Sequence, residues 1–138
     1  MRNAFCIWFL IVCVLGAGCS RSIKVTLINK SGDDIYIKSA SLRTLSIRAG
    51  DTGQFIPGVD DTIDFIVVHN GSDAAYSIKG LAVPPGWVEG KTSMDAVLHL
   101  LIDEKLLVYI LRPNTDPAWS MANQPAGFPL RPRSEVGL

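Results

Sequence analysis

Short stretches of alternating apolar and polar residues, each closed by turn-forming residues, run from Ile23 to Leu111. A period of two is typical of a β-strand with one buried face, because successive side chains point to opposite faces. The stretches are 23–27, 35–37, 45–47, 52–56, 62–68, 75–81, 97–102 and 106–111. Their spacing is typical of a small antiparallel β-sandwich. We therefore expect a mainly β domain over residues 23–111.

Two details of this pattern make predictions about strand pairing. The polar run 29–34 lies between the first two stretches and predicts a hairpin with a long loop joining 23–27 to 35–37. The stretch 62–68 begins as an alternation and becomes apolar throughout, which is typical of a central strand.

The segment 93–111 has two interpretations. Met94, Val97, Leu98 and Leu101 lie at helical spacing, and Ser93 would cap a helix over 93–102, which would make the fold α+β. However, 97–102 and 106–111 flank a polar turn almost symmetrically, and the second run contains Val108, Tyr109 and Ile110. Such residues favour strands. We prefer the hairpin and keep the short helix as the alternative.

The composition changes at residue 112. Five prolines recur in the segment 112–138, at Pro113, Pro117, Pro125, Pro129 and Pro132. Proline at this density interrupts helices and sheet ladders, so we expect an extended Pro-rich tail, either partly docked or disordered. Trp119, Phe128 and Leu130 are its candidate anchors, for docking on the sheet or for binding a partner.

Cysteine usage and charge exclude several classes of protein. All three cysteines, Cys6, Cys13 and Cys19, lie near the start, so nothing after Cys19 can form a disulfide within the chain. The domain must be held together by its core. Thirteen basic residues balance thirteen acidic ones, which gives no electrostatic reason to expect a nucleic-acid partner.

The N-terminal segment has the pattern of an export signal. Arg2 precedes an uncharged apolar run over 4–15. A helix needs about twenty apolar residues to cross a bilayer, and here Gly16 and Gly18 follow the run. We therefore interpret the segment as a signal peptide and not as a permanent span.

The run ends in Leu15-Gly16-Ala17-Gly18-Cys19, which resembles the lipobox of bacterial prolipoproteins. The resemblance covers the leader alone, and we identify no family for the domain. It implies a signal peptide over 1–18, cleavage between Gly18 and Cys19, and lipid attached to the Cys19 sulfur. Membrane lipid would then be a partner of the chain through Cys19.

The residues after Cys19 bear on location. In the prolipoprotein class an aspartate at the next position is associated with retention in the inner membrane, and here that residue is Ser20. The resemblance therefore implies a bacterial cell-envelope protein on the outer membrane, facing the periplasm. The lipidated linker 19–22 leaves three residues before Ile23, a reach of about 10 Å, so we expect the domain to lie against the membrane.

The sequence has no recognisable catalytic or metal-binding motif. The two histidines, His69 and His99, have no neighbouring ligands at metal spacing, and no nucleophile elbow or phosphate loop occurs. We expect no cofactor, no metal and no enzymatic activity. The preferred hypothesis is a non-enzymatic binding or structural module with an envelope protein as partner. The alternatives are an inhibitor or immunity-type lipoprotein, and an envelope hydrolase in which the histidines converge in one cleft.

Overall fold

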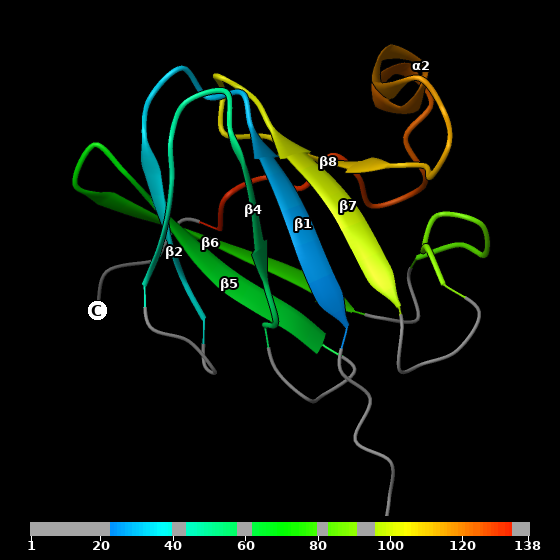
Figure 1. Cartoon of the computed structure of the whole chain (residues 1–138), viewed down its shortest axis with the longest axis horizontal. Coiled ribbons are helices and arrows are strands. Elements are labelled where there is room, and N and C mark those ends of the chain that lie inside the picture. The colour runs from blue at the N-terminus through cyan, green and yellow to red at the C-terminus, as the bar shows by residue number, and fades with distance from the viewer. Residues whose placement is uncertain (1–22, 40–43, 58–61, 80–82, 91–95, 134–138) are drawn as a thin grey trace, which may run out of the picture.

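A computed structural model describes residues 23–39, 44–57, 62–79, 83–90 and 96–133. Within these ranges the chain forms strands and one short helix (Figure 1). They are β1 (Lys24–Asn29), β2 (Ile35–Lys38), β3 (Leu45–Ile47), β4 (Thr52–Phe55), β5 (Thr62–His69), β6 (Ser72–Lys79), β7 (Val97–Ile102), β8 (Val108–Leu111) and α2 (Pro117–Ala122). The prediction of a mainly β fold is confirmed.

The strands of the described chain form two four-stranded sheets, β4-β1-β7-β8 and β3-β2-β5-β6, packed as a small sandwich. All pairs are antiparallel except β1 with β7, which run in the same direction with Leu27 opposite Leu100. Strand β5 lies between β2 and β6, as its apolar run predicted. The parallel pair is a departure from the expected all-antiparallel arrangement.

The core lies between the two sheets and is built from the inward-facing residue of each alternating pair. Val25, Leu27, Leu98, Leu100, Ile102 and Ile110 supply one side, and Ile35, Ile37, Ile63, Phe65, Val67, Tyr76 and Ile78 the other. An aromatic row crosses it, because Phe55 packs edge-on against Phe65, which stacks on Tyr76. This burial, without disulfides, is the main source of stability.

The predicted hairpin between the first two strands is wrong. β1 pairs with β4 and β7, whereas β2 pairs with β3 and β5, so the connection 30–34 crosses from one sheet to the other. The reason lies at Asn29, the fully buried last residue of β1. Its side-chain amide donates to the carbonyls of Asp33 (2.7 Å) and Ile47 (3.0 Å), which fixes the crossing loop.

Within the described residues, three pairs of consecutive strands are antiparallel neighbours: β2–β3, β5–β6 and β7–β8. Asn70 and Gly71 join β5 to β6 with φ of 51° and 78°, the left-handed conformations of a tight two-residue turn. The β6 strand therefore begins at Ser72, earlier than the expected 75. β7 and β8 form the expected hairpin. The alternative, a helix over 93–102, is wrong for residues 97–102, because they form a strand with Leu98 and Leu100 facing the core. Residues 93–95 lie outside the described residues.

Strand direction places short turns at one end of the sandwich. Successive strands alternate in direction, so the connections 30–34, 48–51, 70–71 and 103–107 all lie at the end opposite the start of β1. Figure 1 shows the chain entering β1 from below and these connections at the other end of the strands.

The Pro-rich segment contains a helix that the sequence did not predict. Pro117 is at the first turn of α2, where a missing N–H costs nothing, and Asp116 caps the helix by accepting from the Ala118 N–H at 3.1 Å. Proline density predicts a segment without a helix, but Pro117 starts one and Pro125 lies beyond its end at Ala122. The expectation of a wholly extended segment is therefore wrong.

The same segment lies along the open edges of both sheets. Leu130 exchanges two backbone hydrogen bonds with Val108 of β8, at 2.7 and 3.0 Å, and the Arg133 N–H donates to the Ala75 carbonyl of β6 at 2.9 Å. Residues 130–133 thus pass from the edge of one sheet to the edge of the other. The described part of the segment is docked on the sandwich.

Candidate functional site

The predicted anchor lies outside the described residues. This applies to the signal peptide 1–18, to Gly18 and Cys19 at the predicted cleavage site, and to the linker up to residue 22. Within the described ranges, no helix has the length and apolar character needed to cross a membrane.

Two of the three candidate partner-binding residues contact the protein's own core. Phe128 and Leu130 are partly buried and pack against the core residues, and the backbone of Leu130 pairs with Val108. Their apolar surface contributes to holding the tail on the sandwich. Trp119 differs, because 43% of its surface remains exposed.

Trp119 belongs to a small aromatic surface that we call the tryptophan platform, formed by Trp87, Arg112 and Trp119. The Trp119 ring stacks on Trp87, with ring centres 6.3 Å apart, and Trp87 is itself only 9% exposed. The Arg112 guanidinium carbon lies 5.8 Å from the centre of the Trp119 ring, in the range of a cation–π contact. The platform therefore combines a buried aromatic base, an exposed ring and a cation.

The platform is held by polar contacts between α2 and the edge of β8. Ser120, fully buried, accepts from the Arg112 N–H at 3.1 Å, and the Gln124 side chain bonds both backbone groups of Ile110. Trp119 directly precedes Ser120 on α2. Figure 1 shows α2 beside β8. Sequence analysis identified Trp119 but missed Trp87 and Arg112 as its neighbours; the signal available was that Trp87 and Trp119 are the only tryptophans after the leader.

The histidines do not converge. His69, at the end of β5, has Nε2 2.9 Å from an Asp33 carboxylate oxygen, whereas His99, in the middle of β7, is bonded through Nε2 to Glu89. The two strands belong to different sheets. Each histidine therefore has its own carboxylate partner, and the common cleft that the hydrolase hypothesis requires is not formed.

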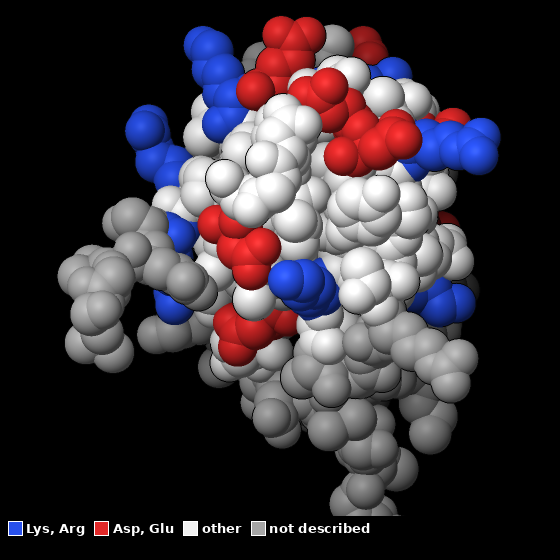
Figure 2. All heavy atoms as spheres, turned by 90° about the vertical axis from the view of Figure 1, so that its left-hand side faces the viewer, with Lys and Arg blue, Asp and Glu red and all other residues white. Residues whose placement is uncertain are grey.

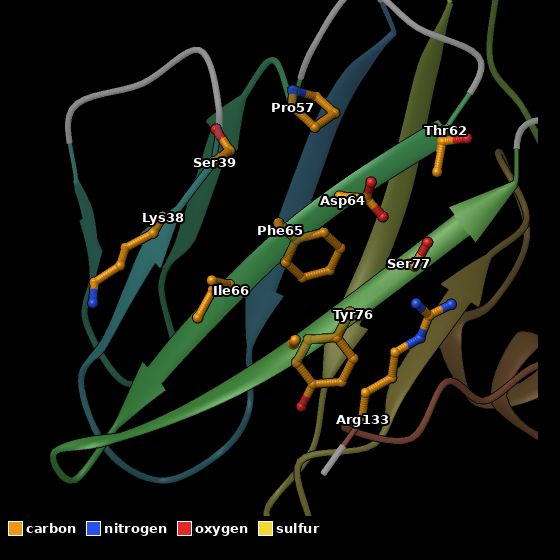
Figure 3. Close-up of a pocket in the computed structure, with 11 residues that line it drawn as sticks. Lys38, Ser39, Pro57, Thr62, Asp64, Phe65, Ile66, Tyr76, Ser77 and Arg133 are labelled. Atoms are coloured by element: carbon orange, nitrogen blue, oxygen red, sulfur yellow. The ribbon is translucent and has the colours of Figure 1, made fainter. Parts of the chain in front are cut away.

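A groove lies on the outer face of the second sheet, over β5 and β6. It encloses about 570 Å³, with Ile66 and Ala75 in its lining and Lys38, Asp64 and Arg133 as its charged residues. Figure 3 shows the Arg133 guanidinium extending along β6 toward Ser77 and Asp64. Sequence reasoning did not find this groove, because its charged residues come from β2, β5 and the tail, which only the fold brings together.

The surface charges are mixed. On the face that Figure 2 presents, acidic and basic side chains are interspersed, in agreement with equal numbers of each in the chain. Among residues placed by the structure, no three His, Cys, Asp or Glu side chains are grouped as metal ligands. These observations define no strongly charged patch on that face.

Two tyrosines have shifted pKa values through burial and one carboxylate. Burial raises the pKa of Tyr76 to about 12, with a further contribution from the negative charge of Asp103. The Tyr76 hydroxyl donates to the Leu106 carbonyl at 2.6 Å. The pKa of Tyr109 is also raised, by desolvation and by Asp103. The Asp103 carboxylate accepts a hydrogen bond from the Tyr109 hydroxyl at 3.2 Å. These hydroxyls remain protonated donors that fix the turn between β7 and β8.

Comparison of the chain with protein-family models, with curated proteins and with solved structures finds no match.

Proposed function

We propose that the chain is a lipoprotein anchored through Cys19, and that its sandwich is a non-enzymatic binding module of the bacterial cell envelope, on the outer membrane and facing the periplasm. The observation that carries the proposal is the leader: an apolar run followed by small residues and Cys19. Strand β1 begins at Lys24, so the folded domain starts close to the proposed lipid.

The geometry of the domain supports binding more than catalysis. The histidines lie in separate sheets, and the described hydrogen bonds of His69 and His99 include no serine or cysteine nucleophile. By contrast, the tryptophan platform exposes an aromatic ring that is already ordered by its neighbours. Tryptophan and arginine are the residue types that most often contribute strongly to binding energy.

Metabolic labelling with a fatty acid tests the anchor. Cells producing the intact chain are grown with a labelled palmitate, and the protein is isolated from the membrane fraction. We expect label in the wild-type chain and in the matched control Cys13→Ser, and none in Cys19→Ser. Label retained in Cys19→Ser would overturn the proposal, because the lipid would then be attached elsewhere.

A further inference from the structure

We propose that the tryptophan platform is a binding site for a neutral glycan, with one sugar ring stacked on the exposed indole of Trp119. This inference rests on the proposed function as an envelope binding module, and it names the class of ligand. It does not depend on the lipid anchor.

The exposed apolar surface at the platform is small. Among the described residues, the other large exposed apolar side chains are Tyr36, on β2 of the second sheet, and Ile56, after β4 at the opposite edge of the first sheet from β8. Trp119 is therefore a single exposed ring. A stable protein interface buries about 800 Å² on each partner, and a membrane-lying helix needs a broad apolar face, whereas one aromatic side chain buries about 150–250 Å². The apolar face of a sugar ring requires no more than one indole.

Arg112 of the platform and Asp116 at the start of α2 also offer polar groups to a ligand. Arg112 has no carboxylate partner in the described structure, so its guanidinium N–H groups remain as donors for a ligand. Asp116, three residues before Trp119, is exposed and uses Oδ1 to cap α2, which leaves Oδ2 as an acceptor. Sugar hydroxyls donate and accept, so they match both groups. The two charges have opposite signs, which favours a neutral ligand over an anionic one.

The platform is preorganised by its neighbours. Trp87 stacks on the Trp119 ring, and Ser120 and Gln124 fix α2 to the edge of β8. A ring that is already ordered loses little conformational freedom when a ligand stacks on it. The platform therefore suits weak but specific binding.

Intrinsic fluorescence tests this proposal. In the full chain carrying Trp8→Phe, purified in a mild detergent, Trp87 and Trp119 are the only tryptophans, so the emission reports on the platform. The probes are β-linked N-acetylglucosamine tetramer and cellotetraose. We expect a saturable change in emission with at least one of them. No saturable change with either would overturn the proposal.

Variants locate the site. Trp119→Ala should weaken binding by at least about tenfold, which is one unit in log Kd, and Trp119→Phe should retain part of the affinity. Arg112→Gln should also weaken binding while leaving the unfolding midpoint close to that of the parent, which separates a binding defect from a folding defect. Tyr36→Ala is the matched control, because Tyr36 is 47% exposed on the other sheet. Equal loss of binding in Tyr36→Ala would place the site elsewhere.

Lipid vesicles distinguish the main competitor. This test uses the leaderless form without detergent, after cooperative unfolding has shown that this form is folded. Vesicles of phosphatidylethanolamine and phosphatidylglycerol should leave its Trp119-dependent emission unchanged. A blue shift with vesicles and none with the glycans would overturn the proposal and assign the platform to the membrane surface. Neither readout involves Cys19, so failure here is separate from failure of the anchor.

Discussion

The side-chain amide of Gln124 pairs with both backbone groups of Ile110. The Ile110 N–H donates to Oε1 at 2.9 Å, and Nε2 donates to the Ile110 carbonyl at 2.8 Å. Ile110 lies on β8, the edge strand of its sheet, so the amide occupies the place of a neighbouring strand. Leu130 pairs with Val108 and Ser120 with Arg112 along the same edge. An edge with its hydrogen bonds already satisfied is protected from pairing with other chains.

Replacing Gln124 tests this edge protection. Gln124→Ala leaves the partly buried Ile110 N–H and carbonyl without their partner, and we expect a loss of about 1–3 kcal/mol in the free energy of unfolding. Gln54→Ala is the control, because Gln54 is exposed and makes one side-chain bond, to Thr26 at 3.3 Å. Urea denaturation measures both. Equal stability of the two variants would contradict the role given to Gln124.

Asn29 should be among the least replaceable polar residues of the described domain. Besides donating to Asp33 and Ile47, its Oδ1 accepts from the N–H and the hydroxyl of Ser31 at 3.0 and 2.6 Å. Asn29→Leu removes all four of these hydrogen bonds at a fully buried position, while the bond from the Ser31 hydroxyl to the Asp33 carbonyl at 3.1 Å can remain, so we expect a loss of about 3 kcal/mol or more. Denaturation of Asn123→Ala provides the comparison and should show a much smaller change, because Asn123 is exposed and its side chain makes one hydrogen bond, to the Trp119 carbonyl.

Gly53 is required where β3 and β4 approach each other. A Cβ at this position would lie 2.6 Å from two side-chain carbons of Ile47 and 3.2 Å from one of Leu45. Ile47 is buried and has little room to move, so Gly53→Ala should destabilise the fold by about 1–3 kcal/mol. A double-mutant cycle measures the contact. Ile47→Ala should cost less in the Gly53→Ala background than in the wild type, and purely additive effects would contradict the clash.

Raising the pH should weaken the domain through Tyr76. Its folded pKa of about 12 lies above the unfolded value of about 10, so the neutral hydroxyl is favoured by folding. The corresponding stability is fully present below about pH 10 and is lost as the pH rises toward about 12. Urea denaturation across this range should show a shallower decline in Tyr76→Phe than in the wild type. Identical declines would show that Tyr76 is not the group responsible.

Sequence reasoning located the strands because alternation depends only on which face of each strand is buried. It did not predict which strands share a sheet, since 23–27 and 35–37 carry the same pattern whether they form a hairpin or cross between sheets. The crossing depends on the buried amide of Asn29, whose partners Asp33 and Ile47 lie in other segments. The parallel pairing of β1 with β7 was equally absent from local patterns.

The Pro-rich tail is a second case in which the sequence did not predict the contacts between distant segments. Proline density predicts an irregular segment, but Pro117 at a helix start and the polar residues Ser120 and Gln124 allow a short helix to dock on β8. The sequence indicates Trp119 as a candidate anchor. Its neighbours Trp87 and Arg112 are distant from each other in the chain, and the fold is needed to bring them together.

The most direct test of the proposed anchor is the mass of the N-terminal peptide of the protein isolated from its own bacterial membranes. We predict that the first residue is Cys19 and that its mass exceeds the unmodified value by a diacylglyceryl group, with or without a further acyl chain. A peptide that extends through an intact Gly18–Cys19 bond, or one that begins at an unmodified Cys19, would contradict the account.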